Sequence, residues 1–179
     1  MKENNLKKIL IVCLFLNSSL SFSQKDYSIK IDLLKSIFGV YQIEGEYFKS
    51  EKLSYGFGYT YIDISLMVVG TPPESSEAER GHSFSPFIRY YTKSNLENSS
   101  FYQANLRYSN MDFIGYVGNP KENILSIDFN YGYQFKIINN LFFEPSIGLG
   151  AGYVISGDKA IKGDIKPYPM LNMNLSLKI

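Results

Sequence analysis

The stretch LSIDFNYGYQF, residues 125–135, decides the fold of this chain. Leu125, Ile127, Phe129 and the three aromatic residues after them alternate strictly with polar or small residues. In an extended strand, this pattern places the apolar side chains on one face and the polar side chains on the other. The C-terminal stretch LNMNLSLKI, residues 171–179, repeats the alternation. Two such amphipathic segments predict an all-β protein.

The same two-residue period marks eight segments of the chain, and nothing between them has a 3.6-residue period of useful length. We therefore predict eight strands. Their ranges are 27–34, 40–47, 54–61, 83–91, 101–109, 125–135, 142–153 and 171–179.

The connections between the expected strands alternate in length. Those after the second, fourth and sixth strands are short, whereas residues 65–82, 110–124 and 154–167 form longer segments rich in Gly, Pro, Ser, Asn and charge. This alternation is typical of an up-and-down barrel with tight turns at one end and long loops at the other. Only the first connection, around residues 35–39, is shorter than the rule predicts.

Pro86 and Pro145 fall inside expected strands. Proline has no backbone N–H, so it removes one hydrogen bond from the ladder, and a closed barrel has no edge strand to hold it. We therefore expect a bulge or a shortened strand at both positions.

Residues 1–23 have the organisation of a secretory signal peptide. Three lysines precede an apolar segment at residues 9–16, and Ser21-Phe22-Ser23 supplies small residues before a cleavage site at Gln24. The apolar segment is too short to span a bilayer, which needs roughly 20 residues. We predict an exported chain with one mature domain, residues 24–179; a buried N-terminal strand is the alternative.

The mature chain is poor in residues that carry chemistry. Cleavage removes Cys13, the only cysteine, and with it disulfide or thiolate chemistry. Lipid attachment at Cys13 is an alternative, although Val12 is larger than the residue that lipoprotein signals place there. Cleavage changes the formal net charge from +1 to −1, so no basic excess points to nucleic acid. One histidine does not supply a zinc site, and we expect no metal or cofactor.

Alternation alone does not say which face of the barrel is outside. A soluble barrel such as a lipocalin turns its apolar face inward, whereas a membrane barrel turns it toward lipid. Three features favour the membrane: 16% aromatic residues, mostly on the apolar face; a strand that runs to the last residue; and nearly balanced charges on the polar face. These charges are Lys30, Asp32, Glu44, Glu46, Arg89, Arg107, Asp128, Glu144 and Lys178.

The predicted fold is therefore an eight-stranded antiparallel up-and-down transmembrane β-barrel. Eight strands enclose a space that side chains largely fill, so we expect a packed polar interior instead of an aqueous channel. Every backbone polar group in lipid must be paired, which requires the first strand to pair with the last.

At this level the sequence resembles the small outer-membrane β-barrels of the OmpA/OmpX type, and more narrowly a barrel family common in Bacteroidota that has no agreed activity. The matching stretches are residues 29–34, 39–47 with Glu46, 86–91 and the C-terminal strand. Such families usually end in an aromatic residue, whereas this chain ends in Ile179. The resemblance implies an outer-membrane location, with outer-membrane lipid and the barrel-assembly machinery as partners. It implies no catalytic residue.

Two motifs could suggest chemistry. Gly148, Gly150 and Gly152 resemble part of a phosphate-binding loop, but no helix follows, and we expect them to make room for long neighbours such as an arginine or to let the barrel bend. His82 with Ser83 or Ser85 and an acid such as Glu144 or Asp128 would form a nucleophilic set like that of outer-membrane lipid-deacylating enzymes. The spacing places His82 and Ser85 on opposite faces, so we interpret His82 as a solvated residue at a loop end.

Two further groups are open to more than one interpretation. The first group consists of Arg89 and Arg107 with the acidic residues of the polar face. It could form a ligand site or a proton path, but we favour a salt-bridge network that fixes the strand register. Residues 72–80, which begin with two prolines, are a partner-binding loop or, as we favour, a solvated loop with one helical turn. We expect a structural or interaction protein. A lipid-modifying enzyme and a soluble lipocalin-like binder are the alternatives.

Overall fold

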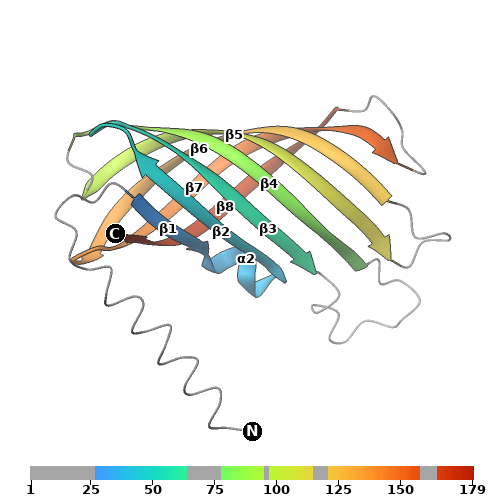
Figure 1. Cartoon of the computed structure of the whole chain (residues 1–179), viewed down its shortest axis with the longest axis horizontal. Helices are drawn as coiled ribbons and strands as arrows, with labels where there is room; N and C mark the ends of the chain where they lie inside the picture. Colours follow the sequence, from blue (N-terminus) through green and yellow to red (C-terminus); the bar gives the residue numbers. More distant parts are fainter. Residues whose placement is uncertain (1–26, 64–77, 95–96, 115–120, 158–164) are drawn as a thin grey trace, which may run out of the picture.

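The computed structural model describes residues 27–63, 78–94, 97–114, 121–157 and 165–179. They form a closed barrel in which sequence neighbours pair antiparallel and the first strand pairs with the last (Figure 1). The elements are β1 (Tyr27–Asp32), α2 (Leu33–Ile37), β2 (Val40–Phe48), β3 (Leu53–Asp63), β4 (Ala78–Tyr91), β5 (Asn98–Ile114), β6 (Lys121–Ile138), β7 (Leu141–Gly157) and β8 (Ile165–Lys178). The predicted eight-stranded up-and-down barrel and its closure are confirmed. Residues 1–23, Cys13 among them, lie outside the described ranges.

The strands wind around the barrel with a stagger. From Ile31, the line of paired residues passes through one residue of each strand and reaches Ile165 of β8. Ile31 itself, however, pairs directly with Leu175 of β8. The offset from position 165 to position 175, ten residues, is the shear of the barrel, and it requires strands that tilt against the barrel axis.

Six strands extend further toward the long-loop end than predicted. β4, β6 and β8 begin earlier, and β3, β5 and β7 end later, so parts of the expected loops are strand. Ile155 and Ile165 are exposed apolar residues in these extensions, but other outward side chains there are polar. Asn110 Nδ2 donates to Asn123 Oδ1 at 2.8 Å, and Asn123 Nδ2 donates to Ser156 Oγ at 2.8 Å. Backbone pairing continues after the apolar alternation has stopped, which is why the sequence pattern underestimates these strands.

The first strand is shorter than predicted. β1 ends at Asp32, and the next five residues form the helical turn α2, which is too short to produce a helical period. Asp32 caps this turn because its Oδ1 accepts a hydrogen bond from the Lys35 N–H at 3.0 Å. Gly39, with φ of 70°, then leads the chain into β2. Among the described residues, no helix is long and apolar enough to cross a membrane.

The expectation of a bulge or a shortened strand at Pro86 and Pro145 is wrong. β4 and β7 continue through the prolines, which pair with Phe57 of β3 and Met173 of β8. On the other side of each proline, the pairing pauses and resumes in unchanged register. A proline lacks only the donor toward one neighbour, so the other neighbour holds the strand in place.

Glycines on the inner face give room to aromatic rings. A Cβ on Gly56 would collide with the ring of Phe87, and one on Gly132 would collide with the ring of Phe101. Both phenylalanines are buried, although they belong to the polar face of their strands. Rings that cover strand glycines restore packing that the missing side chains would otherwise leave open.

This packing predicts opposite results for two alanine substitutions. At Gly132 a Cβ would lie 2.7 Å from Ser146 Cβ and 2.8 Å from the Pro145 carbonyl oxygen, whereas at Gly45 nothing lies within 4 Å. We expect Gly132→Ala to lower the free energy of unfolding by about 1–3 kcal/mol. Gly45→Ala should be neutral or slightly stabilising, because alanine costs less backbone entropy than glycine. Denaturant unfolding of both variants in detergent checks this, and equal losses would contradict the packing described.

Candidate membrane surface and interior ion network

The outer face of the barrel is apolar on all eight strands. Phe129 and Leu149 are 64% and 69% exposed, far beyond what a soluble protein shows over a continuous surface. We call this surface the apolar belt and define it by one exposed residue on each strand: Ile29, Ile43, Phe57, Ile88, Leu106, Phe129, Leu149 and Leu171. The alternative of a barrel with an apolar interior, as in a lipocalin-like binder, is therefore wrong for this chain.

Aromatic rings border the belt toward both ends of the barrel. Toward the short turns, the ring centroids of Tyr27 and Tyr47 lie 5.2 Å apart. Toward the long loops, the Tyr61 ring lies 5.2 Å from the His82 ring, and Tyr41 and Tyr59 lie beside them. On β6 the apolar run of residues 125–135, in a strand tilted as in other small barrels, spans about 25 Å along the barrel axis, the height of a hydrocarbon core crossed by strands.

The inner face carries the charges. Eight of the nine predicted inward charges are buried, and the side chain of Arg107 is 21% exposed, so all nine lie on the expected face. Lys35 of α2, which the sequence pattern left in a connection, adds a tenth charge because its side chain reaches Gln42 of β2. Among these ten side chains, five cations stand against five anions.

Four of these charges meet in the central ion cluster, defined as Lys30, Glu46, Arg89 and Glu144. Lys30 Nζ lies 2.8 Å from Glu46 Oε2 and 2.9 Å from Glu144 Oε2. Arg89 contacts the same Glu144 oxygen at 2.7 Å and reaches Glu46 Oε1 at 3.7 Å. The cluster joins β1, β2, β4 and β7, so it links strands far apart in the sequence.

Neutral groups complete the contacts of the cluster. Glu46 accepts hydrogen bonds from Ser54 Oγ at 2.5 Å and Tyr91 OH at 3.1 Å. Arg89 Nε donates to Gln103 Oε1 at 2.7 Å, and its guanidinium lies 4.0 Å from the centroid of the Phe101 ring. Burying charges costs free energy unless partners of this kind are present. The favoured interpretation of Arg89 as part of a salt-bridge network is therefore supported.

A second set of polar contacts lies nearer the long-loop end. Arg107 pairs with Asp128 at 2.8 Å, and Tyr168 OH donates to the other Asp128 oxygen at 2.5 Å. Lys35 Nζ donates to Gln42 Oε1 at 2.6 Å. Arg107 therefore does not join Arg89 in one site, because each arginine has its own carboxylate partners.

The described interior is closely filled at the level of Lys35 and Arg107. The gap bordered by Lys35, Glu44, Arg107 and their polar neighbours has a volume of about 10 Å³, the space of a single water molecule. Glu44 Oε2 and Asn174 Oδ1 beside it accept no hydrogen bond from the residues that the structure describes. The described interior therefore matches the predicted packed polar core.

The glycine triplet serves packing, as predicted, but for different neighbours. A Cβ on Gly148 would collide with Asn130, and one on Gly150 would collide with Tyr168 and Asp128. The triplet faces inward on β7, and the described chain continues from it as a strand. These glycines make room for a tyrosine and an asparagine, whereas an arginine was the example given for the expected long neighbour.

His82 lies in strand β4 and does not sit at a loop end, so that part of the prediction is wrong. Its side chain faces outward, where Tyr59 OH lies 2.6 Å from His82 Nδ1. Ser85 faces inward and is buried, which confirms that the two residues occupy opposite faces. Ser83 is buried as well and hydrogen-bonds Ser109, so neither serine is near the imidazole as a nucleophile requires.

The remaining predicted features fall partly outside the described residues. Of the segment 72–80, the structure describes residues 78–80 as the start of β4, where a solvated loop was expected. Within the described ranges, no group of three or more His, Cys, Asp or Glu side chains is placed to hold a metal ion. Tyr91, Phe101 and Tyr168 are interior residues that the prediction missed. Tyr91 lies two residues after Arg89 in the same strand, so the two-residue period could have placed its side chain on the inner face as well.

Comparisons with known proteins agree with this geometry. No protein-family model and no curated protein matches the sequence. Two solved structures are similar. The N-terminal β-barrel domain of Pseudomonas aeruginosa OprF aligns with a TM-score of 0.61 at 14% identity, over 87% of this chain and 98% of that one. Neisserial surface protein A aligns with a TM-score of 0.56 at 12% identity, over 86% and 97%. At these identities the likeness shows a shared eight-stranded barrel fold.

The central ion cluster predicts that the stability of the fold depends strongly on the balance of buried charges. We expect Lys30→Met to lower the free energy of unfolding by about 3–5 kcal/mol, because it leaves Glu46 and Glu144 buried with Arg89 alone. Adding Glu144→Gln should recover part of the loss by restoring the balance. Lys121→Met is the matched control, since its pair with Asp112 is exposed and worth less than about 1 kcal/mol. Denaturant unfolding measures all three variants; equal effects at Lys30 and Lys121 would contradict the role of the cluster.

Proposed function

We propose that this chain is an integral outer-membrane β-barrel protein of structural or interaction type, with a closed polar interior and no catalytic activity. The observation that carries the proposal is the inverted arrangement of its side chains. The apolar belt faces outward on every strand, while ten described charges face inward. In water this arrangement would expose the apolar residues without benefit, whereas in a bilayer it satisfies both faces.

Two further observations support the location. Tyrosine rings border the belt on both sides, at the level where a ring is buried in lipid and its hydroxyl stays hydrated. Neisserial surface protein A, whose fold is similar, is by name a surface protein. The signal-peptide pattern of residues 1–23 provides the route of export. We propose outer-membrane lipid and the barrel-assembly machinery as partners, with the long loops directed to the cell exterior.

The absence of catalysis is part of the proposal. The His-Ser-acid set considered in the sequence is split between the two faces of β4. The carboxylates of the central ion cluster are buried against Lys30 and Arg89, which leaves them no access to a substrate. A lipid profile unchanged by His82→Ala would support this part of the proposal, whereas a changed acylation pattern would favour the enzyme.

The membrane orientation predicts the outcome of one substitution. Phe129→Arg places a charge at the centre of the belt and should cost roughly 2–4 kcal/mol, enough to block assembly. Ile138→Arg is the matched control, because Ile138 is similarly exposed but lies at the short-turn end of β6, where the cost falls to about 0–1 kcal/mol. Cell fractionation and gel mobility with and without boiling report on membrane residence and folding. Normal membrane insertion of the Phe129→Arg variant would contradict the proposed contact between the apolar belt and lipid.

The filled interior predicts that the protein does not conduct ions. The gap beside Lys35, Glu44 and Arg107 has room for about one water molecule, and buried charged side chains occupy the rest of the described interior, so we expect no continuous aqueous path for ions along the barrel axis. We expect the purified protein to produce no steady single-channel current in planar bilayers, at the level of detergent-only controls. A reproducible ohmic conductance would contradict a closed interior.

A further inference from the structure

Glu44 stands apart from the other buried carboxylates of the interior. Asp32, Glu46, Asp128 and Glu144 each form an ion pair, with Lys35, Lys30, Arg107 and Arg89 respectively. Glu44 is 5% exposed, yet no described lysine or arginine forms an ion pair with it. Burying a charge without a partner is costly, so such a group is normally paired or bound to a metal ion. The Glu44 carboxylate therefore calls for a counter-charge.

The two cations beside Glu44 are already engaged. Lys35 Nζ lies 3.5 Å from Asp32 Oδ2 and donates to Gln42 Oε1 at 2.6 Å. Gln42 Nε2 in turn donates to Glu44 Oε1, so an amide lies between the ammonium group and the carboxylate. Arg107 has its own carboxylate partner, 2.8 Å away. Neither cation therefore serves as a direct partner of Glu44.

The remaining interior cations are engaged as well. Lys30 and Arg89 belong to the central ion cluster, where they contact two other carboxylates. Lys178 Nζ lies 4.2 Å from the centroid of the Phe142 ring and 4.9 Å from that of the Phe48 ring, toward the short turns. None of the five described interior cations is therefore left to compensate Glu44.

The gap beside Glu44 is lined by oxygen-bearing side chains. Its volume of about 10 Å³ is that of one water molecule. Two serines, Lys35, Glu44 and Arg107 border it together with six amides: Gln42, Gln103, Asn105, Asn130, Asn172 and Asn174. Glu44 Oε2 and Asn174 Oδ1 are buried and accept no hydrogen bond from the described residues. Carboxylate and amide oxygens of this kind can replace the hydration shell of a small cation.

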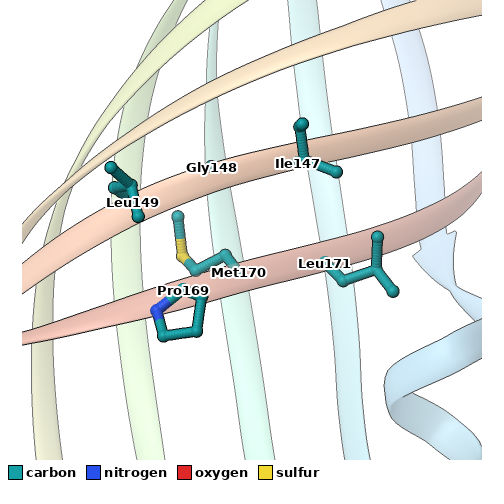
Figure 2. Close-up of a pocket in the computed structure, with 6 residues that line it drawn as sticks. All are labelled: Ile147, Gly148, Leu149, Pro169, Met170 and Leu171. Atoms are coloured by element: carbon teal, nitrogen blue, oxygen red, sulfur yellow. The ribbon is translucent and has the colours of Figure 1, made fainter.

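The grooves on the outer surface offer no such combination. Figure 2 shows the groove over β7 and β8, which is lined by Ile147, Gly148, Leu149, Pro169, Met170 and Leu171. This lining contains neither a carboxylate nor a side-chain amide. The groove is a part of the lipid-facing surface, whereas in the gap an uncompensated charge and unpartnered oxygens occur together.

We propose that the gap binds a monovalent cation close to a water molecule in size, such as K⁺, through Glu44 Oε2 and Asn174 Oδ1. One positive charge balances the single carboxylate, whereas a water molecule satisfies the oxygens and leaves the charge uncompensated. Mg²⁺ keeps several waters and Ca²⁺ needs six to eight oxygen ligands, for which the gap has no room. The bound ion joins β2 to β8 on either side of β1, and it does not depend on the membrane location.

The effect of potassium on stability tests the proposal. The purified protein is folded in detergent micelles and unfolded with urea in equal concentrations of KCl or choline chloride, since choline is too large for the gap. A ligand that binds the folded state stabilises it by mass action. At ten times its dissociation constant, K⁺ should therefore raise the ratio of folded to unfolded protein about elevenfold.

Two glutamine substitutions separate a bound ion from a general salt effect. Glu44→Gln keeps the shape of the side chain and removes its charge, so we expect the difference between the two salts to disappear. Glu51→Gln is the matched control, because Glu51 is exposed in the short turn after β2, and this variant should keep the difference. Equal stability of the wild-type protein in both salts would overturn the cation site. A potassium effect that Glu44→Gln retains would overturn it as well.

A direct measurement on the wild-type protein covers the case in which Glu44→Gln does not fold. Crystals are soaked in thallous acetate, because Tl⁺ substitutes for K⁺ and scatters anomalously. An anomalous peak between Glu44 Oε2 and Asn174 Oδ1 supports the cation site. Density at that point without an anomalous signal means that water occupies the gap, and it would overturn the proposal.

Discussion

The pairing of β1 with β8 is the constraint on which the rest of the structure depends. Hydrocarbon offers no hydrogen bonds, so an open sheet edge would leave a row of N–H and C=O groups unsatisfied at several kcal/mol each. Closure removes that edge and, with a ten-residue stagger between Ile165 and Leu175, sets the tilt of all eight strands. Once the cylinder is closed, the two faces of each strand have different surroundings, and the interior is only wide enough for side chains.

The interior charges follow from this narrow, enclosed space. A lone buried charge would be expensive, so Lys30 and Arg89 share Glu46 and Glu144 instead of each facing water. These contacts also constrain register. A slip of β2 by one residue would turn Glu46 to the outer face and bring Tyr47 inside, so the cluster and the apolar belt specify the same alignment. The nearly filled core is the result of satisfying these groups from opposite walls.

Where closure is incomplete, the chain uses other means to satisfy its backbone. Asp32 ends β1, caps α2 through the Lys35 N–H and accepts the N–H of Met173 from β8, so one carboxylate serves both the helical turn and one β8 donor that has no strand partner. The helical turn α2 satisfies its own hydrogen bonds, and the prolines of β8 have no N–H to leave unpaired. These local solutions explain how a short first strand is compatible with a closed barrel.

The alternation in residues 125–135 and in the other seven segments determined the fold class, the number of strands and the face that each charge occupies, because side-chain direction in a strand depends only on parity. Strand ends were predicted less well: outward Asn110 and Asn123 carry no apolar signal, yet their backbones remain paired. Parity alone also could not say that Arg89 meets Glu144 while Arg107 meets Asp128, that Lys35 turns inward from a five-residue helix, or that Tyr168 covers Gly150. Those contacts join residues far apart in the chain. They depend on the shear and closure of the cylinder, which only the tertiary structure decides.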